Sequence, residues 1–333
     1  MNTRLGVSLE ALESELREAV DGEVRFDDGT LAAYSTDASN YRQVPIGVVV
    51  PRTPDAAAVA VRIAARHHAP VLSRGGGTSL AGECTNTALV IDWSKYCHEI
   101  EHVDLEQRSA IVQPGVVLDV LNAHLEPHGL RFGPEPSTHP NCTLGGMLGN
   151  NSCGATAQRY GKTADNIRRL EVITQDGERF WIGRCNDDRF PELSWDAVMA
   201  AGGRRAEIYR QLKDLVDEYA DRIRKGYPDI PRRVSGYSLD ALLPENGFDV
   251  AKAVVGSEST CLTILRADLE LAPTPKATAL VLLGFRDVPA SGDAVPSILP
   301  YDPFRLEGVD KQLIDLERTR GMHAQSMDEL PDG

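Results

Sequence analysis

The chain has 333 residues, which is enough for one large domain or two ordinary ones. Apolar residues make up 42% and charged residues 25%, a mixture typical of globular proteins that excludes a disordered or fibrous chain. With 49 acidic and 35 basic residues the net charge is −14, which argues against nucleic-acid binding as the main role.

No segment approaches the ~20 uninterrupted apolar residues of a membrane span. Residues 1–17 also lack a basic region followed by an apolar one, so the sequence predicts a cytoplasmic protein without a transmembrane segment. The six cysteines are scattered and form no C-x-x-C pair. Zinc ribbons and ferredoxin-type clusters are therefore disfavoured, no metal site is predicted, and buried free thiols are expected.

The first elements alternate between helix and strand. Ser8 precedes apolar residues at helical spacing, which predicts an entry helix that ends before Asp21. A strand at 46–50 is followed by a helix capped by Thr53 and running to about His68, and then by a second strand at 69–73. This order leads directly into a glycine-rich stretch at 74–82.

The later elements are predicted from periodicity and turn residues. Asp176-Gly177 joins two strand-like runs, which predicts a hairpin with a type I′ turn. We expect strands at 88–93, 109–112, 169–174, 178–182, 262–271 and 279–285, and helices after Pro114-Gly115, at 205–224 and at 247–254.

The stretch at 74–82 has the features of an anion-binding loop. Three glycines after a strand let backbone N–H groups converge on one point, and Thr78 and Ser79 add hydroxyl donors. No Gly-Lys-Ser/Thr follows, so a nucleoside triphosphatase loop is poorly supported. From these residues alone, a plain flexible loop remains the alternative. If the loop binds a phosphate, Gly76→Val is expected to remove the ligand without unfolding the chain.

Two further segments have the same character. Residues 133–166 are rich in glycine, proline and small polar residues without being repetitive, and residues 255–260 offer another turn of donors between a helix and a strand. One diphosphate with a ring system at each end would use all three segments.

These three segments carry a resemblance. Arg-Gly-Gly-Gly-Thr-Ser-Leu-Ala-Gly at 74–82, Gly-Gly-Met-Leu-Gly-Asn-Asn-Ser-Cys-Gly at 145–154 and Gly-Ser-Glu-Ser-Thr at 256–260 resemble the FAD-binding domain of the p-cresol methylhydroxylase/vanillyl-alcohol oxidase (PCMH) superfamily. The branch is that of D-lactate dehydrogenase, the glycolate oxidase flavoprotein subunit and D-2-hydroxyglutarate dehydrogenase, with similarity to the N-terminal part of bacterial FAD/iron–sulfur fusion oxidoreductases.

The resemblance implies an α+β fold, the PCMH-type FAD-binding fold of two α/β subdomains with the beginning of a cap domain. We expect an N-terminal helical extension at 1–45, the FAD-binding domain at 46–275 with subdomains of about 46–112 and 113–275, and an incomplete cap, or substrate, domain at 276–333. The resemblance to the start of the cap covers 279–328.

The resemblance also implies a cofactor site. Thr78 stands where some superfamily members have a flavin-attaching histidine, so the FAD is expected to be non-covalent, and Ser259 stands where the family usually has glycine. The implied cofactor-binding residues are Arg74, Gly75, Gly76, Gly77, Thr78, Ser79, Leu80, Gly82, Ser137, Thr138, Gly145, Gly146, Gly149, Asn150, Ser152, Gly154, Gly161, Gly256, Glu258 and Ile264. No catalytic residue is assigned.

The implied activity is hydride transfer from a D-2-hydroxy acid such as D-lactate, glycolate or D-2-hydroxyglutarate to flavin N5, which yields the 2-oxo acid. The electron acceptor would be an iron–sulfur protein or a quinone-linked partner, and the protein could lie at the inner face of the membrane. The alternative is a truncated or subunit-type FAD-binding protein that needs a partner chain, because the histidine-rich and cysteine-rich motifs of the relatives do not occur in these residues.

Other polar residues are weaker candidates. His98 and His102, like His124 and His128, have helical spacing but lack a metal-binding context, so solvated surface histidines are expected. Cys153 has no neighbouring base or resolving cysteine in the sequence, which favours packing over redox chemistry. The pairs Arg168-Arg169 and Arg232-Arg233 could bind a substrate carboxylate or be solvated.

Overall fold

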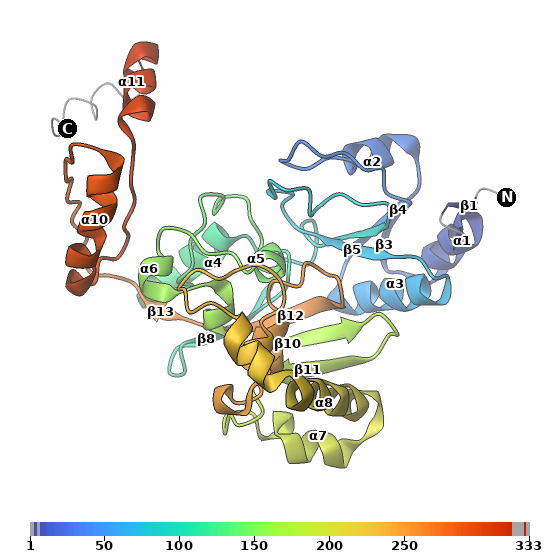
Figure 1. The fold of residues 1–333 in the computed structure, drawn as a ribbon. Helices are drawn as coiled ribbons and strands as arrows, with labels where there is room; N and C mark the ends of the chain where they lie inside the picture. Colours follow the sequence, from blue (N-terminus) through green and yellow to red (C-terminus); the bar gives the residue numbers. More distant parts are fainter. Residues whose placement is uncertain (1–2, 5–6, 322–329, 331–333) are drawn as a thin grey trace.

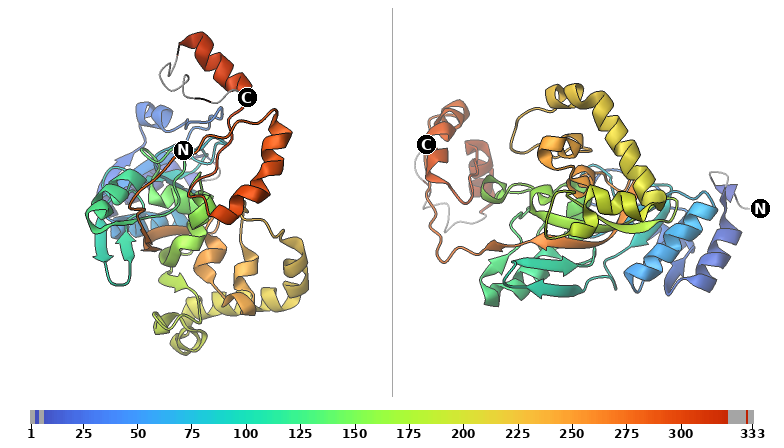
Figure 2. Two further views of the ribbon diagram at one scale, coloured as in Figure 1. Left: turned by 90° about the vertical axis from the view of Figure 1, so that its left-hand side faces the viewer. Right: turned by 90° about the horizontal axis from the view of Figure 1, so that it is seen from below.

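The computed structural model describes residues 3–4, 7–321 and 330. Two sheets with helices packed on them form its body, and two helices near the C-terminus extend away from that body (Figure 1). In Figure 1 and in the right-hand view of Figure 2, the described segments near the N-terminus and near the C-terminus lie at opposite ends of the molecule. The structure is 40% helical and 19% strand, so the protein mixes helix and sheet as expected.

The first sheet has the order β3-β4-β6-β5, in which β3 is antiparallel to β4 and the other pairs are parallel. Every residue of β4 is buried because the sheet is covered on both faces: Val49 belongs to one apolar core, whereas Val48 and Val50 belong to another. The strands are β3 (Gly22–Arg25), β4 (Gly47–Pro51), β5 (Val71–Arg74) and β6 (Leu89–Asp92).

Helices α1 (Leu9–Ala19) and α3 (Pro54–Arg66) pack against one face of this sheet, and α2 (Asp28–Ala33) lies near the other. Thr53 caps α3 as predicted, since its Oγ1 accepts from the Ala56 N–H at 3.1 Å. Ser8 stands at the N-cap of α1 without a side-chain hydrogen bond. The predicted strand–helix–strand order before residue 74 is therefore confirmed. A short ribbon of β1 (Thr3–Arg4) and β2 (Val7–Ser8) precedes it.

The second sheet is fully antiparallel, with the order β11-β10-β12-β8-β7. Ile173 of β10 and Leu265 of β12 contribute to the core around α3, so the two sheets share apolar packing. The strands are β7 (Ile100–Asp104), β8 (Ser109–Val112), β10 (Ile167–Thr174), β11 (Arg179–Gly183) and β12 (Leu262–Glu270).

The largest core lies between this sheet and the helices that cover it. Helix α8 buries Ala206, Tyr209, Val216 and Ile223 along one face, as its predicted periodicity requires. The covering helices are α4 (Leu118–Leu125), α5 (Leu144–Asn150), α6 (Ala157–Tyr160), α7 (Trp195–Ala201), α8 (Gly203–Gly226) and α9 (Val250–Val254). Short 3-10 turns lie at Glu126–His128, Thr163–Asn166, Pro191–Leu193, Leu239–Leu242, Pro244–Asn246 and Leu299–Tyr301.

The two sheets do not divide the chain where the sequence suggested. Strands β7 and β8 precede residue 113, yet they pair with each other and, through β8, with β12 of the second sheet. The sheets therefore divide the chain between β6 and β7, whereas the resemblance implies a subdomain boundary near residue 112. Strand β3, from the predicted N-terminal extension, likewise belongs to the first sheet.

The hairpin of β10 and β11 is confirmed, but its turn is of another type. The Gly177 N–H donates to the Thr174 carbonyl, and the Thr174 N–H donates to the Glu178 carbonyl, both at 2.9 Å. Gly177 has a φ of +91°, and Asp176 is not among the residues with positive φ. A type I′ turn requires positive φ at both central residues, so the predicted turn type is wrong and a three-residue loop closes the hairpin.

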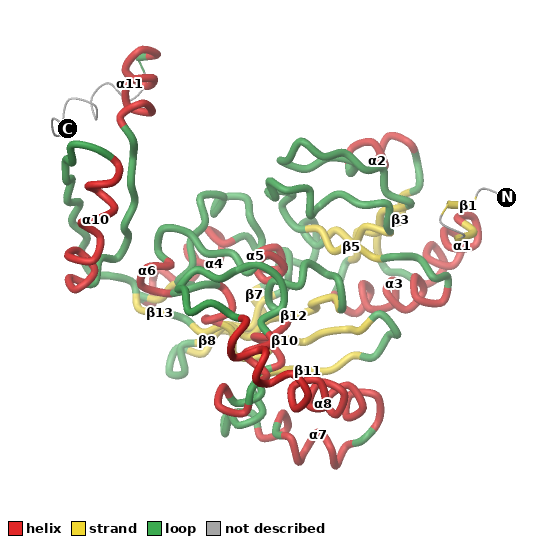
Figure 3. The backbone as a smooth tube through the Cα atoms, in the orientation of Figure 1, coloured by secondary structure: helices red, strands yellow, loops and turns green. Residues whose placement is uncertain are grey.

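The C-terminal segment 276–321 forms an arm. It follows the short pair of β9 (Leu130–Arg131) and β13 (Ala272–Pro273), and it carries α10 (Val288–Ile298) and α11 (Lys311–Arg320), neither of which buries a residue. The predicted strand at 279–285 is wrong: this segment is loop (Figure 3), because no neighbouring strand pairs with it among the described residues. Residues 322–328 of the expected cap resemblance lie outside the described residues.

Candidate functional site

The loop after β5 is held by the side chain of Arg74. Its guanidinium donates to the carbonyls of Cys84 at 2.8 Å, Thr36 at 2.8 Å and Tyr34 at 3.4 Å, and it lies over the Tyr34 ring. We call residues 74–82 the glycine loop. The Arg74 hydrogen bonds connect both ends of this loop to the segment that follows α2. Because the guanidinium is engaged with protein carbonyls, the anion donors that the loop can offer are its backbone N–H groups and its hydroxyls.

The first two loop glycines pack against residues 141–143, which directly precede the second motif at 145–154. A Cβ added at Gly75 would lie 2.1 Å from Oγ1 of Thr143, and one added at Gly76 would lie 2.1 Å from the carbonyl oxygen of Asn141. Both distances are far below van der Waals contact, so glycine is required there for protein packing. The Gly76→Val expectation thus needs a correction, because the missing side chain of Gly76 faces residue 141 and not a ligand.

The third motif is bonded to helix α5 of the second. The N–H of Gly256 donates to the Leu148 carbonyl at 2.8 Å, and that of Glu258 donates to the Gly149 carbonyl at 3.1 Å. Thr143 caps α5, with its Oγ1 accepting from the Gly146 N–H at 3.3 Å. The three motifs, far apart in the sequence, therefore meet in one place.

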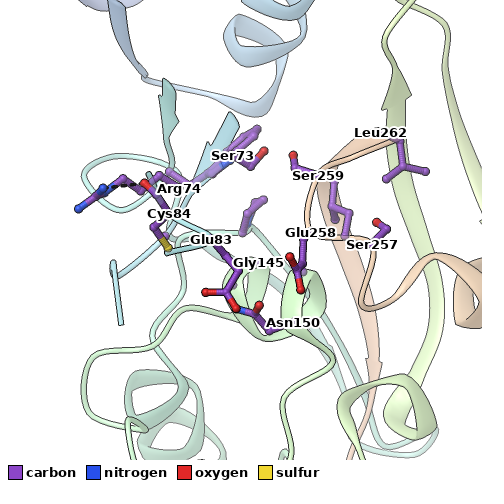
Figure 4. Close-up of a pocket in the computed structure, with 16 residues that line it drawn as sticks. Ser73, Arg74, Glu83, Cys84, Gly145, Asn150, Ser257, Glu258, Ser259 and Leu262 are labelled. Atoms are coloured by element: carbon purple, nitrogen blue, oxygen red, sulfur yellow. Dashed lines mark hydrogen bonds between the residues drawn. The ribbon is translucent and has the colours of Figure 1, made fainter. Parts of the chain in front are cut away.

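A pocket of about 630 Å³, partly open to solvent, lies where the motifs meet (Figure 4). A second pocket of about 460 Å³ adjoins it, since Gly75, Cys84, Gly146 and Asn150 line both. The predicted site residues that line one or both pockets are Arg74, Gly75, Gly76, Gly77, Thr78, Ser79, Thr138, Gly145, Gly146, Gly149, Asn150, Ser152, Glu258 and Ile264.

Six predicted site residues lie outside both linings. Leu80 is 79% exposed, and the Gly154 carbonyl accepts a hydrogen bond from Arg232. Contact with a cofactor stays a prediction for these residues and for those that line the pockets. The six are Leu80, Gly82, Ser137, Gly154, Gly161 and Gly256.

Several lining residues were missed by the sequence analysis. Ser73 and Trp93 lie at the ends of the parallel strands β5 and β6, and the carboxyl ends of parallel strands share one sheet edge, so the strand predictions contained a usable signal. Cys142 and Met147, before and within the second motif, line the second pocket. The other missed residues are Glu83, Cys84, Pro114, Thr143, Ser257, Ser259 and Leu262.

The pocket has the features of a site for an extended ligand with ring systems. The hydroxyl oxygen of Ser73 is buried and has no hydrogen-bond partner among the described residues. A Cβ added at Gly149 would meet no atom within 4 Å, although Gly149 lines the pocket. Trp93 and Leu262 supply apolar wall. The pocket thus combines a hydroxyl without a partner, open space beside Gly149 and apolar side chains along its wall. These features fit the FAD that the resemblance implies.

The tip of the third motif is strained and acidic. Glu258 and Ser259 have φ values of +51° and +65°, a backbone region that disfavours side chains by about 1–2 kcal/mol per residue. Ser259 thus adopts a glycine-like conformation at the position where the family usually has glycine. Burial, and to a lesser extent the Glu83 carboxylate, raise the pKa of Glu258. Both carboxylates enter the pocket, from opposite walls (Figure 4).

Three of the four arginines in the two Arg-Arg pairs lie beside carboxylates of the protein, and Arg232 does not. Arg168 is buried beside Glu270, and Arg169 pairs with Asp268 at 3.0 Å. Arg233 pairs with Asp240 at 2.6 Å. Arg232, which is exposed, donates to the Gly154 carbonyl and so lies beside the second motif at 145–154, although neither residue lines a pocket.

The histidines and Cys153 lie outside both pocket linings. His98, His102, His124 and His128 are exposed, as expected of solvated surface residues. Across the part of the chain that the structure describes, no group of three or more His, Cys, Asp or Glu residues is arranged to hold a metal ion.

Cys84 provides a chemical probe of the site, because it lines both pockets. Burial raises the pKa of its thiol, so the reactive thiolate is scarce at neutral pH and increases as pH rises. We expect slow alkylation by iodoacetamide that accelerates with pH and is suppressed by bound FAD, measured by peptide mass spectrometry. Cys185, whose pKa burial raises to about 11, lines neither pocket and serves as the control. Equal labelling of Cys84 with and without FAD would contradict the site.

The chain is similar to a family of FAD-binding domains and to several curated proteins. Residues 45–183 match the family of FAD binding domains. The chain is 30% identical over 314 residues to a D-2-hydroxyglutarate dehydrogenase of Pseudomonas putida, covering 92% of this chain and 30% of that protein. It is 27% identical over 299 residues to the glycolate oxidase subunit GlcD of Bacillus subtilis, covering 88% of this chain and 52% of that subunit.

The solved structures support the fold. An alkyldihydroxyacetonephosphate synthase superposes with a TM-score of 0.56 at 16% identity, over 80% of this chain and 44% of that one. The chain spans about a third of the length of the D-2-hydroxyglutarate dehydrogenases that it matches. Among the described residues, no helix is both long and apolar enough to span a membrane.

Proposed function

The chain carries an FAD-binding domain of the PCMH type, and on this premise we propose that it is the flavin-binding part of a dehydrogenase that oxidises a D-2-hydroxy acid to the 2-oxo acid. The observation that supports the proposal is the convergence of the three glycine-bearing motifs on one pocket. Relatives named D-2-hydroxyglutarate dehydrogenase, glycolate oxidase subunit and D-lactate dehydrogenase supply the substrate class.

When bound, FAD would supply the hydride acceptor. The chain's own residues would hold it without a covalent bond. The N–H groups and hydroxyls of residues 75–79 would donate to the pyrophosphate, and the Ser73 hydroxyl would gain the hydrogen-bond partner that it lacks. Trp93, Leu262 and Ile264 would exclude water from the ring system. Arg232 is our candidate for orienting the substrate carboxylate, because its guanidinium lies beside the middle motif.

The test is an anaerobic titration of the FAD-loaded chain with glycolate, D-lactate and D-2-hydroxyglutarate, with L-lactate as the stereochemical control. Bleaching of the flavin absorption by one of the D-acids or by glycolate, and not by L-lactate, is the expected result. Arg232→Gln is expected to raise the concentration of hydroxy acid needed for half-reduction about tenfold or more, since a charged hydrogen bond to the carboxylate is lost. A chain that binds no FAD would overturn the proposal.

We infer a second candidate, a subunit that binds FAD but needs a partner chain for turnover. The arm favours it: Leu280, Val281, Leu282 and Leu283 are all exposed, by 84%, 74%, 45% and 55%. Four consecutive apolar residues of this kind are typical of a strand buried on both faces, so a polypeptide that supplies neighbouring strands would cover them. FAD that stays bound but is bleached by none of the hydroxy acids would favour this candidate.

We also propose that electrons leave through an iron–sulfur or quinone-linked partner, as the word subunit in the names of the glycolate oxidase relatives suggests. All six cysteines are free in the structure, which supports a reducing compartment such as the cytoplasm. Electrons would then be delivered by peripheral association of the protein with the inner face of the membrane.

A further inference from the structure

The Glu83 carboxylate accepts hydrogen bonds from two donors of the glycine loop. The Ser79 hydroxyl and the Ala81 N–H, the latter at 3.3 Å, both donate to Oε2 of Glu83. Ser79 lines the second pocket, and Ala81 lies two residues further along the same loop. The carboxylate therefore stands, relative to these donors, where a bound anion would stand.

The surroundings of this carboxylate offer an anionic ligand little compensation. Among the residues that the structure describes, Arg74 is the one cationic side chain that lines either pocket, and its guanidinium is engaged with three carbonyls. Glu258 lies on the opposite wall, and its pKa is raised by burial and by the nearby Glu83. A pyrophosphate brought to the loop would meet negative charge and would compete with Glu83 for the same donors.

We propose that Glu83 is an internal anion that holds the glycine loop in the cofactor-free chain and must be displaced when FAD binds. The inference rests on the placement of the FAD pyrophosphate at residues 75–79 in the proposed function. Its consequence is that Glu83 orders the loop before binding and lowers the affinity for FAD. On binding, the Ser79 hydroxyl passes to a phosphate oxygen, and the Glu83 carboxylate turns to water.

The experiment compares FAD affinity in the full chain and in Glu83→Gln, which keeps the shape of the side chain and removes its charge. FAD titrations followed by flavin fluorescence at low and at high salt give the dissociation constants. We expect about tenfold tighter binding in the variant at low salt, and a smaller difference at high salt because ions screen the repulsion. Glu106→Gln, an exposed site between β7 and β8, makes the same change in net charge and should leave the affinity unchanged.

Unchanged affinity in Glu83→Gln would overturn the inference. A gain that is the same at both salt concentrations would overturn it too, since the effect would then come from packing and not from charge. These outcomes differ from failure of the site itself, in which Gly149→Leu, a variant that fills the pocket, would still bind FAD.

Discussion

Gly149→Leu is expected to abolish FAD binding while leaving the fold intact. An added Cβ at Gly149 meets no atom within 4 Å, yet the residue lines the pocket, so a leucine side chain would extend into the space that the cofactor needs. Gly149 lies in α5 and does not have positive φ, and replacing a helical glycine by leucine favours the helix by about 0.5–1 kcal/mol. We expect FAD affinity to fall at least about a hundredfold, with an equal or higher melting temperature.

The measurements are FAD titration and thermal unfolding of the cofactor-free chains. Gly292→Leu is the matched control, because Gly292 is also helical, in α10, with no atom within 4 Å of an added Cβ and outside both pocket linings. Gly149→Ala should give an intermediate loss of affinity. If Gly149→Leu bound FAD as tightly as the parent chain, the cofactor would have to lie elsewhere.

Local patterns predicted the elements that form the first sheet and its helices. Residues 46–50 are all apolar or glycine, and β4 is indeed a central strand covered on both faces. Thr53 and Pro54 marked the start of α3 because capping is a short-range interaction. Information of this kind lies within a few residues, which is why sequence periodicity captured it.

The sequence also predicted which segments form the site, but not how they meet. Gly256 and Glu258 donate to carbonyls of residues more than a hundred positions earlier, and no local pattern encodes that pairing. The role of Arg74 was hidden for the same reason. Two of its three acceptors are the carbonyls of Tyr34 and Thr36, about forty residues earlier in the chain. Only the tertiary structure shows that the Arg74 guanidinium holds the loop in place.

The predicted strand at 279–285 shows where propensity is insufficient. Its apolar residues favour a buried strand, but a strand exists only where another strand pairs with it. The predicted type of the hairpin turn was wrong for a related reason. Asp-Gly is compatible with several turn types, and the loop length that selects among them depends on the register of the two strands.

Gly76→Val is expected to lose both stability and FAD, in contrast to Gly149→Leu. The added Cβ would lie 2.1 Å from the carbonyl oxygen of Asn141, a backbone atom that cannot rotate away. Either the glycine loop or residues 141–143 must move, which we expect to cost about 2–4 kcal/mol, as for other overpacked sites. The same movement separates the donors of residues 75–79 from the middle motif, so FAD affinity falls as well.

Urea unfolding of the cofactor-free chain, together with FAD titration, measures the two losses separately. Gly308→Val is the matched control, since a Cβ at this exposed position meets no atom within 4 Å and should change neither quantity. If Gly76→Val lost FAD at an unchanged urea midpoint, the glycine would be required only for close approach of the phosphate, and the packing of the loop on Asn141 would be too soft to matter. If the urea midpoint and the FAD affinity fall together, the glycines at 75–76 are needed to pack the glycine loop against residues 141–143. The cofactor site then depends on that packing.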